Sequence, residues 1–389
     1  MHNPANRDRG SPGALTLQAT MTCPHRTALH QAKRLVVKMG SAIVVDDHGF
    51  ARRRVADILD AILQETSDTC HLVIVSSGAV AAGMLALGVN HVKAKGETRW
   101  ACAAAGQGAN WRHWNDLLQE RHRVPAQVLL TESDFSERDR YVQTADVLVK
   151  LMRLGAVPVI NENDTASGKT ARRPSTVFDD NDRLAALVAS SIDACGLLLL
   201  TNVDGVFDRP PHQDGAVLLN EWHDASLVQL GSASSLGRGG MGAKIRAAQR
   251  AARSGVPAYI ANGCRPDSLR SILRGFPGGT LFPPAPRMNK RKRWIAQATS
   301  PRGSLVINHG AIVALHHHTS SLLSAGLMAV EGEFDAANVV AIKDENRLVI
   351  GRGICTKSST EVREAVAQRQ KSATLIRRDD LVIFEEGDQ

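Results

Sequence analysis

Short apolar runs alternate with amphipathic segments along the chain from residue 34 onward. The run RLVVK is followed by RRRVADILDAILQE, in which apolar residues recur at helical spacing, and then by HLVIVSS. Short β-branched runs predict buried strands, and apolar residues spaced three and four apart predict a helix. Strands that alternate with helices indicate βαβ units, and hence a parallel sheet covered on both faces.

The same alternation continues as far as residue 274. We expect further strands at PAQVLL, VPVIN, GLLLLTN and VPAYIAN, and further helices at GAVAAGMLALG, around 146–153, after Asn181 and at 266–274. The pattern therefore predicts an α/β domain with an open, mainly parallel sheet sandwiched by helices.

The pattern changes after Thr280. Prolines in LFPPAPR and the basic segment NKRKRW precede short strands separated by glycines, namely SLVINHGAIVAL, LMAVEGEF, NVVAIKD, RLVIGRGI and DLVIFEE, with one helix at TEVREAVAQ. Such strands predict a small β-barrel. A length of 389 residues also exceeds that of most single cores, which favours two domains. We expect a flexible extension at 1–33, an α/β domain at 34–284, a linker at 285–300 and the barrel at 301–386.

Composition restricts the class of protein. Hydrophobic residues make up 43% of the chain and aromatic residues only 4%, so the core is built from aliphatic side chains. The formal net charge of +8 suits anionic ligands without requiring nucleic acid. The six cysteines form no CxxC pair, so we expect neither a zinc site nor a disulfide framework, and a reducing cytoplasm fits best.

Two stretches bear on membranes and targeting. The weakly charged stretch 184–200 is interrupted by Asp193 and Gly196, so it predicts a buried helix and strand rather than a membrane span. Residues 1–33 lack the apolar stretch of a secretory signal. A disordered extension, an organelle-targeting peptide and a translation start at Met21 all remain open for this segment.

Polar residues that follow the predicted strands are the first candidates for chemistry. Lys38 ends a strand and is followed by Gly40 and Ser41, and Ser77 and Gly78 stand between a strand and a helix of small residues. Ligands of open α/β sheets collect at the carboxyl ends of the strands. A lysine and exposed backbone N–H groups at that edge would bind an anion.

Acidic and amide residues gather in two further segments. The strand VPVIN, which ends at Asn161, runs into Glu162, Asn163 and Asp164, and Asp179 to Asp182 precede a predicted helix. Helix capping explains one such residue but not four in succession. Because neighbouring carboxylates repel one another, we expect cations nearby, supplied by a ligand's amino group, by lysines or by magnesium.

A glycine-rich segment precedes the predicted helix that carries Lys244. Its glycines stand at positions 237, 239, 240 and 242, and they permit a close approach of the backbone to phosphates. The spacing matches a dinucleotide fingerprint, but no strand precedes it and no acid follows the next strand. It is not a Walker A loop, because Ala243 separates Gly242 from Lys244. Thr201 and Asn202, after GLLLL, are candidates for a wall against the nucleotide.

Taken in order, VVKMGS, VSSGAVAAG, INEND, DDNDRLAA, LLLLTNVDGVFD and GRGGMGAK resemble the amino-acid kinase family. The C-terminal segment resembles a PUA domain. The first resemblance implies ATP-dependent phosphorylation of the γ-carboxylate of L-glutamate to L-glutamyl 5-phosphate, the first step of proline biosynthesis. It also implies Mg²⁺ with the ATP, a glutamyl-phosphate reductase downstream, feedback inhibition by proline and a homo-oligomer.

The resemblance assigns roles to individual residues. Lys38 and Lys244 would stabilise the transferring phosphoryl group, and Asp182 would orient both lysines. Glutamate would be held by Ser77, Gly78, Asn161, Asp164 and Asn181. ATP would lie against Lys38, Gly40, Ser41, Thr201, Asn202, Arg238, Gly239, Gly240, Met241, Gly242, Ala243 and Lys244. Arg238, Gly242 and Ala243 depart from the hydroxyl residues common in bacterial relatives, and Ser41 and Asn202 replace Thr and Asp.

Other functions remain open. The chain could be another carboxylate kinase of the same fold, or the kinase half of a bifunctional pyrroline-5-carboxylate synthetase, against which the C-terminal barrel argues. An RNA-binding or regulatory protein is the alternative from another class, because the segment Arg287 to Arg293 is basic. The barrel strands show no interleaved aromatics for base stacking, so we do not expect RNA. His316 to His318 would point to alternating sides of a strand, so we expect no metal site there.

Overall fold

A seven-stranded sheet forms the centre of the larger domain. The computed structural model describes residues 26, 29, 31–90, 93, 95–131, 133–166, 181–223, 240–297, 301–317, 320–368, 370 and 372–384. The strands are β1 (Arg34–Met39), β4 (His71–Ser76), β5 (Val124–Leu130), β6 (Ala156–Glu162), β7 (Gly196–Thr201), β8 (Ala258–Asn262) and β9 (Thr280–Phe282). Their order is β5-β6-β4-β1-β7-β8-β9, and only β9 is antiparallel to its neighbour. The mainly parallel sheet is confirmed.

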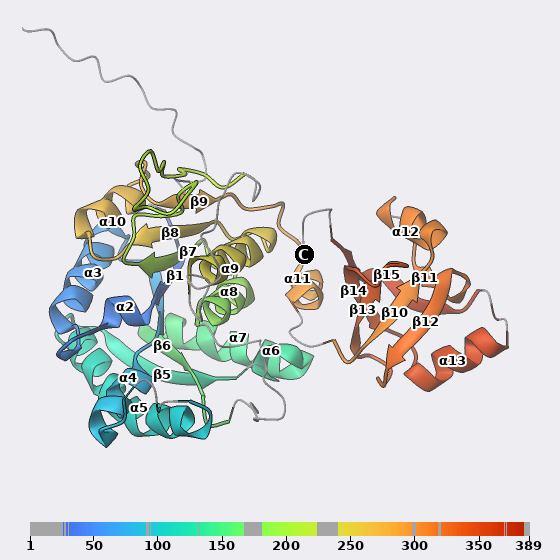
Figure 1. Cartoon of the computed structure of the whole chain (residues 1–389), viewed down its shortest axis with the longest axis horizontal. Coiled ribbons are helices and arrows are strands. Elements are labelled where there is room, and N and C mark those ends of the chain that lie inside the picture. The colour runs from blue at the N-terminus through green and yellow to red at the C-terminus, as the bar shows by residue number, and fades with distance from the viewer. Residues whose placement is uncertain are drawn as a thin grey trace, which may run out of the picture.

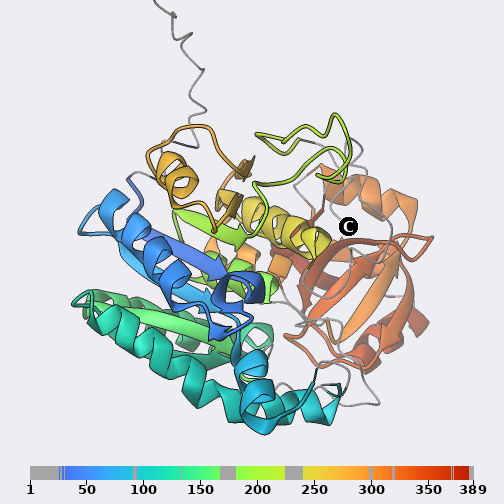
Figure 2. The same ribbon diagram turned by 60° about the vertical axis from the view of Figure 1, so that its left-hand side comes forward.

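Helices cover both faces of this sheet (Figures 1 and 2). One face packs against α7 (Arg138–Arg153), α8 (Asn181–Ser191) and α9 (Met241–Arg253), and the other against α3 (Arg52–Glu65), α5 (Glu97–Gln119) and α10 (Pro266–Leu273). Alternate residues of β1 contribute to the two cores: Val36 joins the first, and Leu35 and Val37 join the second. The predicted sandwich is thus present.

Several short elements and one long helix were not predicted from the sequence. The long helix is α5, whose segment ACAAAGQGAN is dominated by small residues and shows no apolar stripe. The short elements that were not expected include α2 (Ser41–Val44), β2 (Val45–Asp46), β3 (Gly49–Phe50) and α6 (Ser133–Ser136). The helix expected at GAVAAGMLALG is present as α4 (Ala79–Leu87).

A second sheet of six strands curls around its own core in the C-terminal part. It has the order β11 (Leu322–Leu323), β15 (Thr374–Ile383), β14 (Val349–Cys355), β13 (Val339–Lys343), β10 (Gly303–Ile307) and β12 (Leu327–Gly332). Helix α13 (Ser359–Ala367) begins at Ser358 with a complete capping box to Glu361. The predicted small barrel is therefore confirmed in the form of a curled half-barrel.

The expectation of one continuous strand at SLVINHGAIVAL is wrong. Strand β10 ends at Ile307, and Asn308 begins helix α12 (His309–His316) by accepting a hydrogen bond from the backbone N–H of Ala311 at 2.9 Å. Side-chain capping by Asn ends the strand and starts the helix. His316 and His317 thus lie at a helix end rather than in a strand, and His318 lies outside the described residues. Within the described ranges, no three His, Cys, Asp or Glu residues form a metal-binding group.

Helix α11 (Lys290–Gln297) lies in the segment expected to be a linker and stands between the two sheets (Figure 1). Trp294 and Ile295 are buried, and they join the α/β core to Val339, Ile354 and Val382 of the C-terminal sheet. A continuous apolar core therefore connects the two parts.

Polar contacts strengthen this connection. Arg291 forms an ion pair with Asp380 at 2.5 Å, and Arg293 forms one with Asp193. Arg352 donates a hydrogen bond to the carbonyl of Ala296 at 2.8 Å, and burial lowers the pKa of its guanidinium to about 10. The basic segment that raised the possibility of RNA binding thus places two of its arginines in contacts within the chain.

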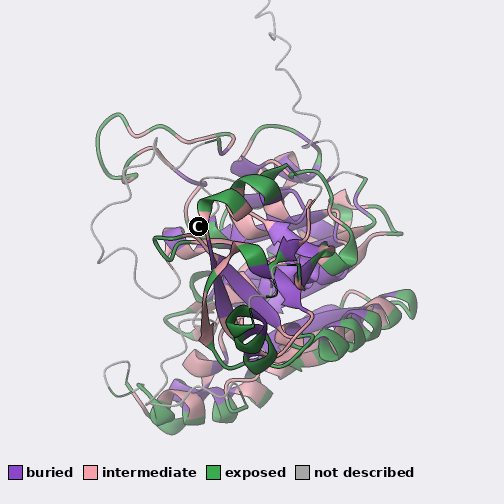
Figure 3. Cartoon of the chain, turned by 90° about the vertical axis from the view of Figure 1, so that its right-hand side faces the viewer, coloured by how far each residue is buried: buried purple, intermediate pink, exposed green. Residues whose placement is uncertain are grey.

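Burial follows the layers of the structure. Buried residues concentrate in the strands and the inward faces of the helices, while the outer helix faces are exposed (Figure 3). None of the helices in the described ranges combines the length and apolarity needed to cross a bilayer.

Candidate functional site

The carboxyl ends of five neighbouring strands bring polar residues to one edge of the sheet. In spatial order, β6 ends near Asn161, β4 is followed by Ser77, β1 ends near Lys38, β7 ends at Thr201 and β8 ends at Asn262. Because β1 is central, Lys38 lies between two groups of polar side chains. One group comes from β4 and β6, and the other from β7 and β8.

Asp182 joins the two predicted lysines. Its Oδ1 lies 2.5 Å from Lys38 Nζ, and its Oδ2 accepts a hydrogen bond from Lys244 Nζ at 3.0 Å. Lys38 comes from β1, Asp182 from the first turn of α8, and Lys244 from the beginning of α9. The structure brings together three residues that are far apart in the sequence.

All three charged groups are withdrawn from solvent. The exposed fractions of Lys38, Asp182 and Lys244 are 3%, 0% and 6%. Two cations and one carboxylate leave one net positive charge, and the first turns of α8 and α9 add the positive ends of their helix dipoles. Buried positive charge is stabilised by an anion, so the arrangement suits a phosphate group.

The direction of Lys38 follows from strand periodicity. Lys38 lies two residues after Val36, so both side chains face the layer formed by α8 and α9. Gly40 is buried beside the ammonium group, and a Cβ at position 40 would lie 3.3 Å from Lys38 Nζ. A side chain there would crowd the lysine.

Asn181 organises the group of residues on the β4 and β6 side. Its Nδ2 donates to the carbonyl of Ser76 at 2.7 Å, to Ser77 Oγ at 3.1 Å and to Asn161 Oδ1 at 3.1 Å. Of the residues predicted to bind glutamate, Ser77 and Asn161 are therefore joined through Asn181. Asp164 is half-buried in the turn after β6.

Sequence reasoning missed Gln107 of α5. Its Oε1 accepts a hydrogen bond from Asn161 Nδ2 at 2.8 Å, which extends the Asn181 network by one residue. Gln107 lies in the small-residue segment of α5, away from the strand ends and acidic clusters that identified the other candidate residues. In the sequence, only its neighbours Gly106 and Gly108 indicated that this part of the helix could approach other backbone closely.

Those glycines matter because α4 and α5 pack almost backbone to backbone. A Cβ on Gly106 would lie 1.9 Å from the carbonyl oxygen of Ala79, and a Cβ on Gly83 would lie 1.7 Å from that of Cys102. Gly78, with φ of 109°, makes the left-handed turn into α4. The close contact fixes the turn that carries Ser77 and Gly78.

On the β7 and β8 side, the structure adds residues to those predicted. Thr201 is buried at the end of β7 and Asn202 is exposed. Nearby, Asp204 accepts hydrogen bonds from Asn262 Nδ2 at 2.8 Å and from Arg265 at 3.1 Å. Asp204 and Asn262 were not among the candidate site residues, although Asn262 ends β8 and Asp204 follows the end of β7 by three residues.

The glycine-rich segment is described only at its end. Gly240 precedes α9 in extended backbone, and Met241, Gly242 and Ala243 form the first turn before Lys244. Ser41, exposed, begins α2 beside Gly40. Gly237, Arg238 and Gly239, together with Asp179 and Asp180, lie outside the described residues.

Comparison with known proteins agrees with this geometry. Residues 33–262 match the model of the amino acid kinase family, and residues 303–378 match that of the PUA domain. A glutamate 5-kinase from Synechococcus elongatus is 36% identical over 90% of this chain and 100% of its own length. One from Chromohalobacter salexigens is 40% identical over 92% of this chain and 98% of its own. The chain therefore belongs to the amino acid kinase family, in the branch of the glutamate 5-kinases, and carries a C-terminal PUA domain.

Proposed function

We propose that this chain transfers the γ-phosphoryl group of ATP to the γ-carboxylate of L-glutamate, giving L-glutamyl 5-phosphate, the first step of proline biosynthesis. The observation that carries the proposal is the buried Asp182 carboxylate between Lys38 and Lys244. Two ammonium groups therefore lie at the carboxyl end of the central strand β1. The polar residues of β4 and β6 lie on one side of that strand, and those of β7 and β8 lie on the other.

The acceptor needs no general base. A γ-carboxylate with a pKa near ~4.3 is ionised at neutral pH, so one carboxylate oxygen attacks the γ-phosphorus directly. The bond from the γ-phosphorus to the β–γ bridging oxygen breaks, and ADP leaves with that electron pair. The obstacle is the approach of two anions and the charge on the equatorial oxygens, which Lys38 and Lys244 reduce.

The two polar groups divide the substrates between them. Glutamate would be held by Ser77, Gly78, Asn161, Asp164 and Asn181. The hydroxyl of Ser77 and the amides of Asn161 and Asn181 lie together on the β4 and β6 side. Thr201 and Asn202, with Gly40, Ser41 and residues 238–244, would hold ATP on the β7 side. Lys38, on the strand between them, lies where the two substrates would meet.

Mg²⁺ would accompany the ATP phosphates. Both oxygens of Asp182 are engaged by lysines, which fits an orienting role better than metal ligation. When bound, the ion would neutralise phosphate charge. Feedback inhibition by proline, a homo-oligomer and a cytoplasmic location stay predictions from the resemblance and the composition.

Trapping the product with hydroxylamine tests the substrate. With purified protein and Mg-ATP, we expect glutamate to give an acyl hydroxamate at a rate at least ~10-fold above aspartate or N-acetylglutamate, because the polar residues on the β4 and β6 side should favour the correct chain length and free amine. Chelation of Mg²⁺ by EDTA should remove the signal. A clear preference for aspartate or N-acetylglutamate would assign the chain to another carboxylate.

A further inference from the structure

A second polar hollow lies at the opposite end of the elements that carry Lys38 and Asp182. Its volume is about 390 Å³, and its walls come from the start of β1, the face of α7, the end of α8 and the start of α11. The charged residues that line it are Arg34, Asp146, Lys150, Arg153, Asp193 and Lys290.

Positive charge predominates in this hollow. Arg34, Lys150 and Arg153 form no ion pair with any described residue, so three cations converge without a carboxylate partner. Asp193 is already engaged by Arg293 and lies 3.8 Å from Lys290. Arg293 also donates to the carbonyl of Ser190 at 3.3 Å, which covers part of the negative end of α8.

Arg34 supplies an independent observation. Its Nε is buried and has no hydrogen-bond partner among the described residues. A buried donor without an acceptor is unfavourable by ~1–3 kcal/mol, and no acceptor within the described residues competes for this part of the guanidinium group. Arg34 also lines the hollow, so an oxyanion there would lie beside a guanidinium group that no carboxylate neutralises.

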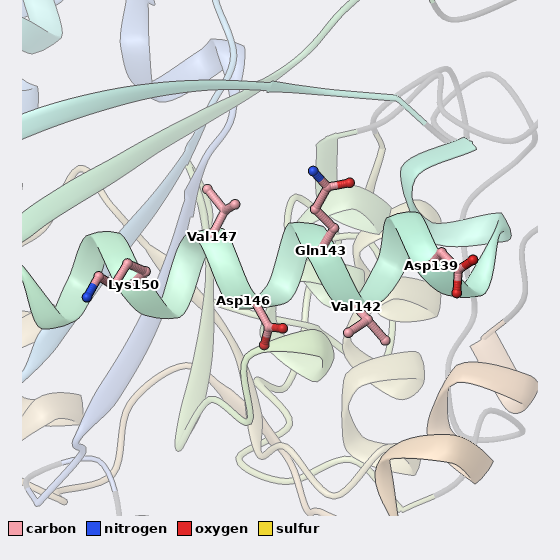
Figure 4. A pocket seen from close by; sticks show the side chains of 6 residues that line it. All are labelled: Asp139, Val142, Gln143, Asp146, Val147 and Lys150. Carbon is pink, nitrogen blue, oxygen red and sulfur yellow. The ribbon is translucent and has the colours of Figure 1, made fainter.

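The neighbouring hollow along α7 has a different character. Its volume is about 530 Å³. Figure 4 shows the side chains that line it, which are Asp139, Val142, Gln143, Asp146, Val147 and Lys150. The charged ends of Asp146 and Lys150 lie apart on the helix, and the two residues form no ion pair. Lys150 is therefore available to the hollow that Arg34 and Arg153 also line.

We propose that the hollow bounded by Arg34, Lys150, Arg153 and Lys290 binds a phosphate-type oxyanion. Guanidinium groups bind such anions through two parallel N–H donors, and lysines add point charge. The two acids in the walls are outnumbered by the four cations, which suits a compact ligand with two negative charges.

This hollow is separate from the phosphoryl-transfer site. Arg34 precedes Lys38 by four residues on β1, a separation of ~13 Å along a strand. Ser191 ends the helix whose first turn holds Asp182, ~14 Å away along its axis. An anion bound here would contact the far ends of the same strand and helix, out of reach of the reacting groups.

Titration of inorganic phosphate into the full chain by calorimetry at low ionic strength tests the proposal. In the double variant Lys150→Gln and Arg153→Gln, both at exposed helix positions, we expect phosphate affinity at this site to fall at least ~10-fold through loss of two charge-assisted contacts. Any binding at the catalytic lysines is common to all variants, so the difference reports this hollow. Arg53→Gln with Arg112→Gln removes the same charge from exposed positions elsewhere and should leave the isotherm within ~2-fold.

The result that would overturn the proposal is an isotherm of the Lys150→Gln and Arg153→Gln variant equal to that of the wild type, or equal losses in both double variants. A second measurement requires no substitution. Crystals of the wild-type chain soaked in selenate should show an anomalous peak between Arg34, Lys150 and Arg153. Absence of a peak there, with selenate bound at other positions, would also overturn it.

Discussion

The single variants Lys38→Ala and Lys244→Ala should each show a kcat about a thousandfold lower than that of the wild type. At an effective dielectric of ~20, one charge pair at ~4 Å contributes ~4 kcal/mol, and each ~1.4 kcal/mol changes a rate tenfold. Loss of either lysine also leaves the buried Asp182 carboxylate less neutralised and turns its charge against the incoming phosphate. Steady-state rates of hydroxamate formation at saturating glutamate and ATP would measure the effect.

Lys33→Ala provides the matched control for this prediction. Lys33 is exposed immediately before β1, at the end of the strand opposite to Lys38, so its removal should change kcat less than ~2-fold. Because truncation of a buried ion pair also destabilises a fold by ~3–5 kcal/mol, melting temperatures must accompany the rates. Near-normal turnover in a folded Lys38→Ala or Lys244→Ala variant would remove that lysine from the mechanism.

Gly106→Ala should both destabilise the protein and impair its use of glutamate. The added Cβ would lie 1.9 Å from the carbonyl oxygen of Ala79 and 2.3 Å from the backbone nitrogen of Gly83, so α4 and α5 must separate. Overpacking of this kind lowers the free energy of unfolding by ~1–3 kcal/mol. Displacement of α4 also moves Ser77 and Gly78, and a shift of ~1 Å near a reacting group can reduce kcat/KM for glutamate ~100-fold.

Gly108→Ala is the internal control, two residues further along the same helix. Gly108 is exposed, and no heavy atom lies within 4 Å of the position of its Cβ. Alanine is favoured over glycine in a helix interior by ~0.5–1 kcal/mol, so this variant should be slightly more stable and fully active. The two substitutions thus have opposite expected signs in thermal unfolding. Equal melting temperatures would contradict the close helix contact.

Most elements of the larger domain could be predicted from local pattern, for identifiable reasons. The segment RRRVADILDAILQE matches α3 residue for residue, because its apolar stripe repeats at helical spacing. The helix expected after Asn181 is present as α8, which already includes Asn181 and Asp182, since amide and acidic residues favour helix starts. Helix α5 was not predicted because its first half consists mainly of small residues. Their burial depends on contact with α4 rather than on an apolar stripe.

In the C-terminal part, the local pattern of apolar residues did not suffice to predict the elements correctly. The apolar residues of SLVINHGAIVAL are compatible with a strand or a helix, and the Asn308 cap decided the boundary. Segment 285–300 seemed a linker because of its prolines and basic residues. Its Trp294 and Arg293 instead find buried partners on α8 and the second sheet, which no local rule could have identified.

By itself, the sequence determined the alternation of strands and helices and the presence of a second domain. It also identified Lys38, Asp182 and Lys244 as candidate site residues. Those features depend on periodicity and on the order of segments, which the chain carries locally. Only the tertiary structure decided how the two oxygens of Asp182 divide between the lysines and that Gln107 supports Asn161. It also decided that three cations without an ion pair to any described residue meet at the far end of β1 and α8. These contacts join residues separated by tens to hundreds of positions, and their geometry depends on the strand order and the packing of helices, which side-chain pattern alone does not encode.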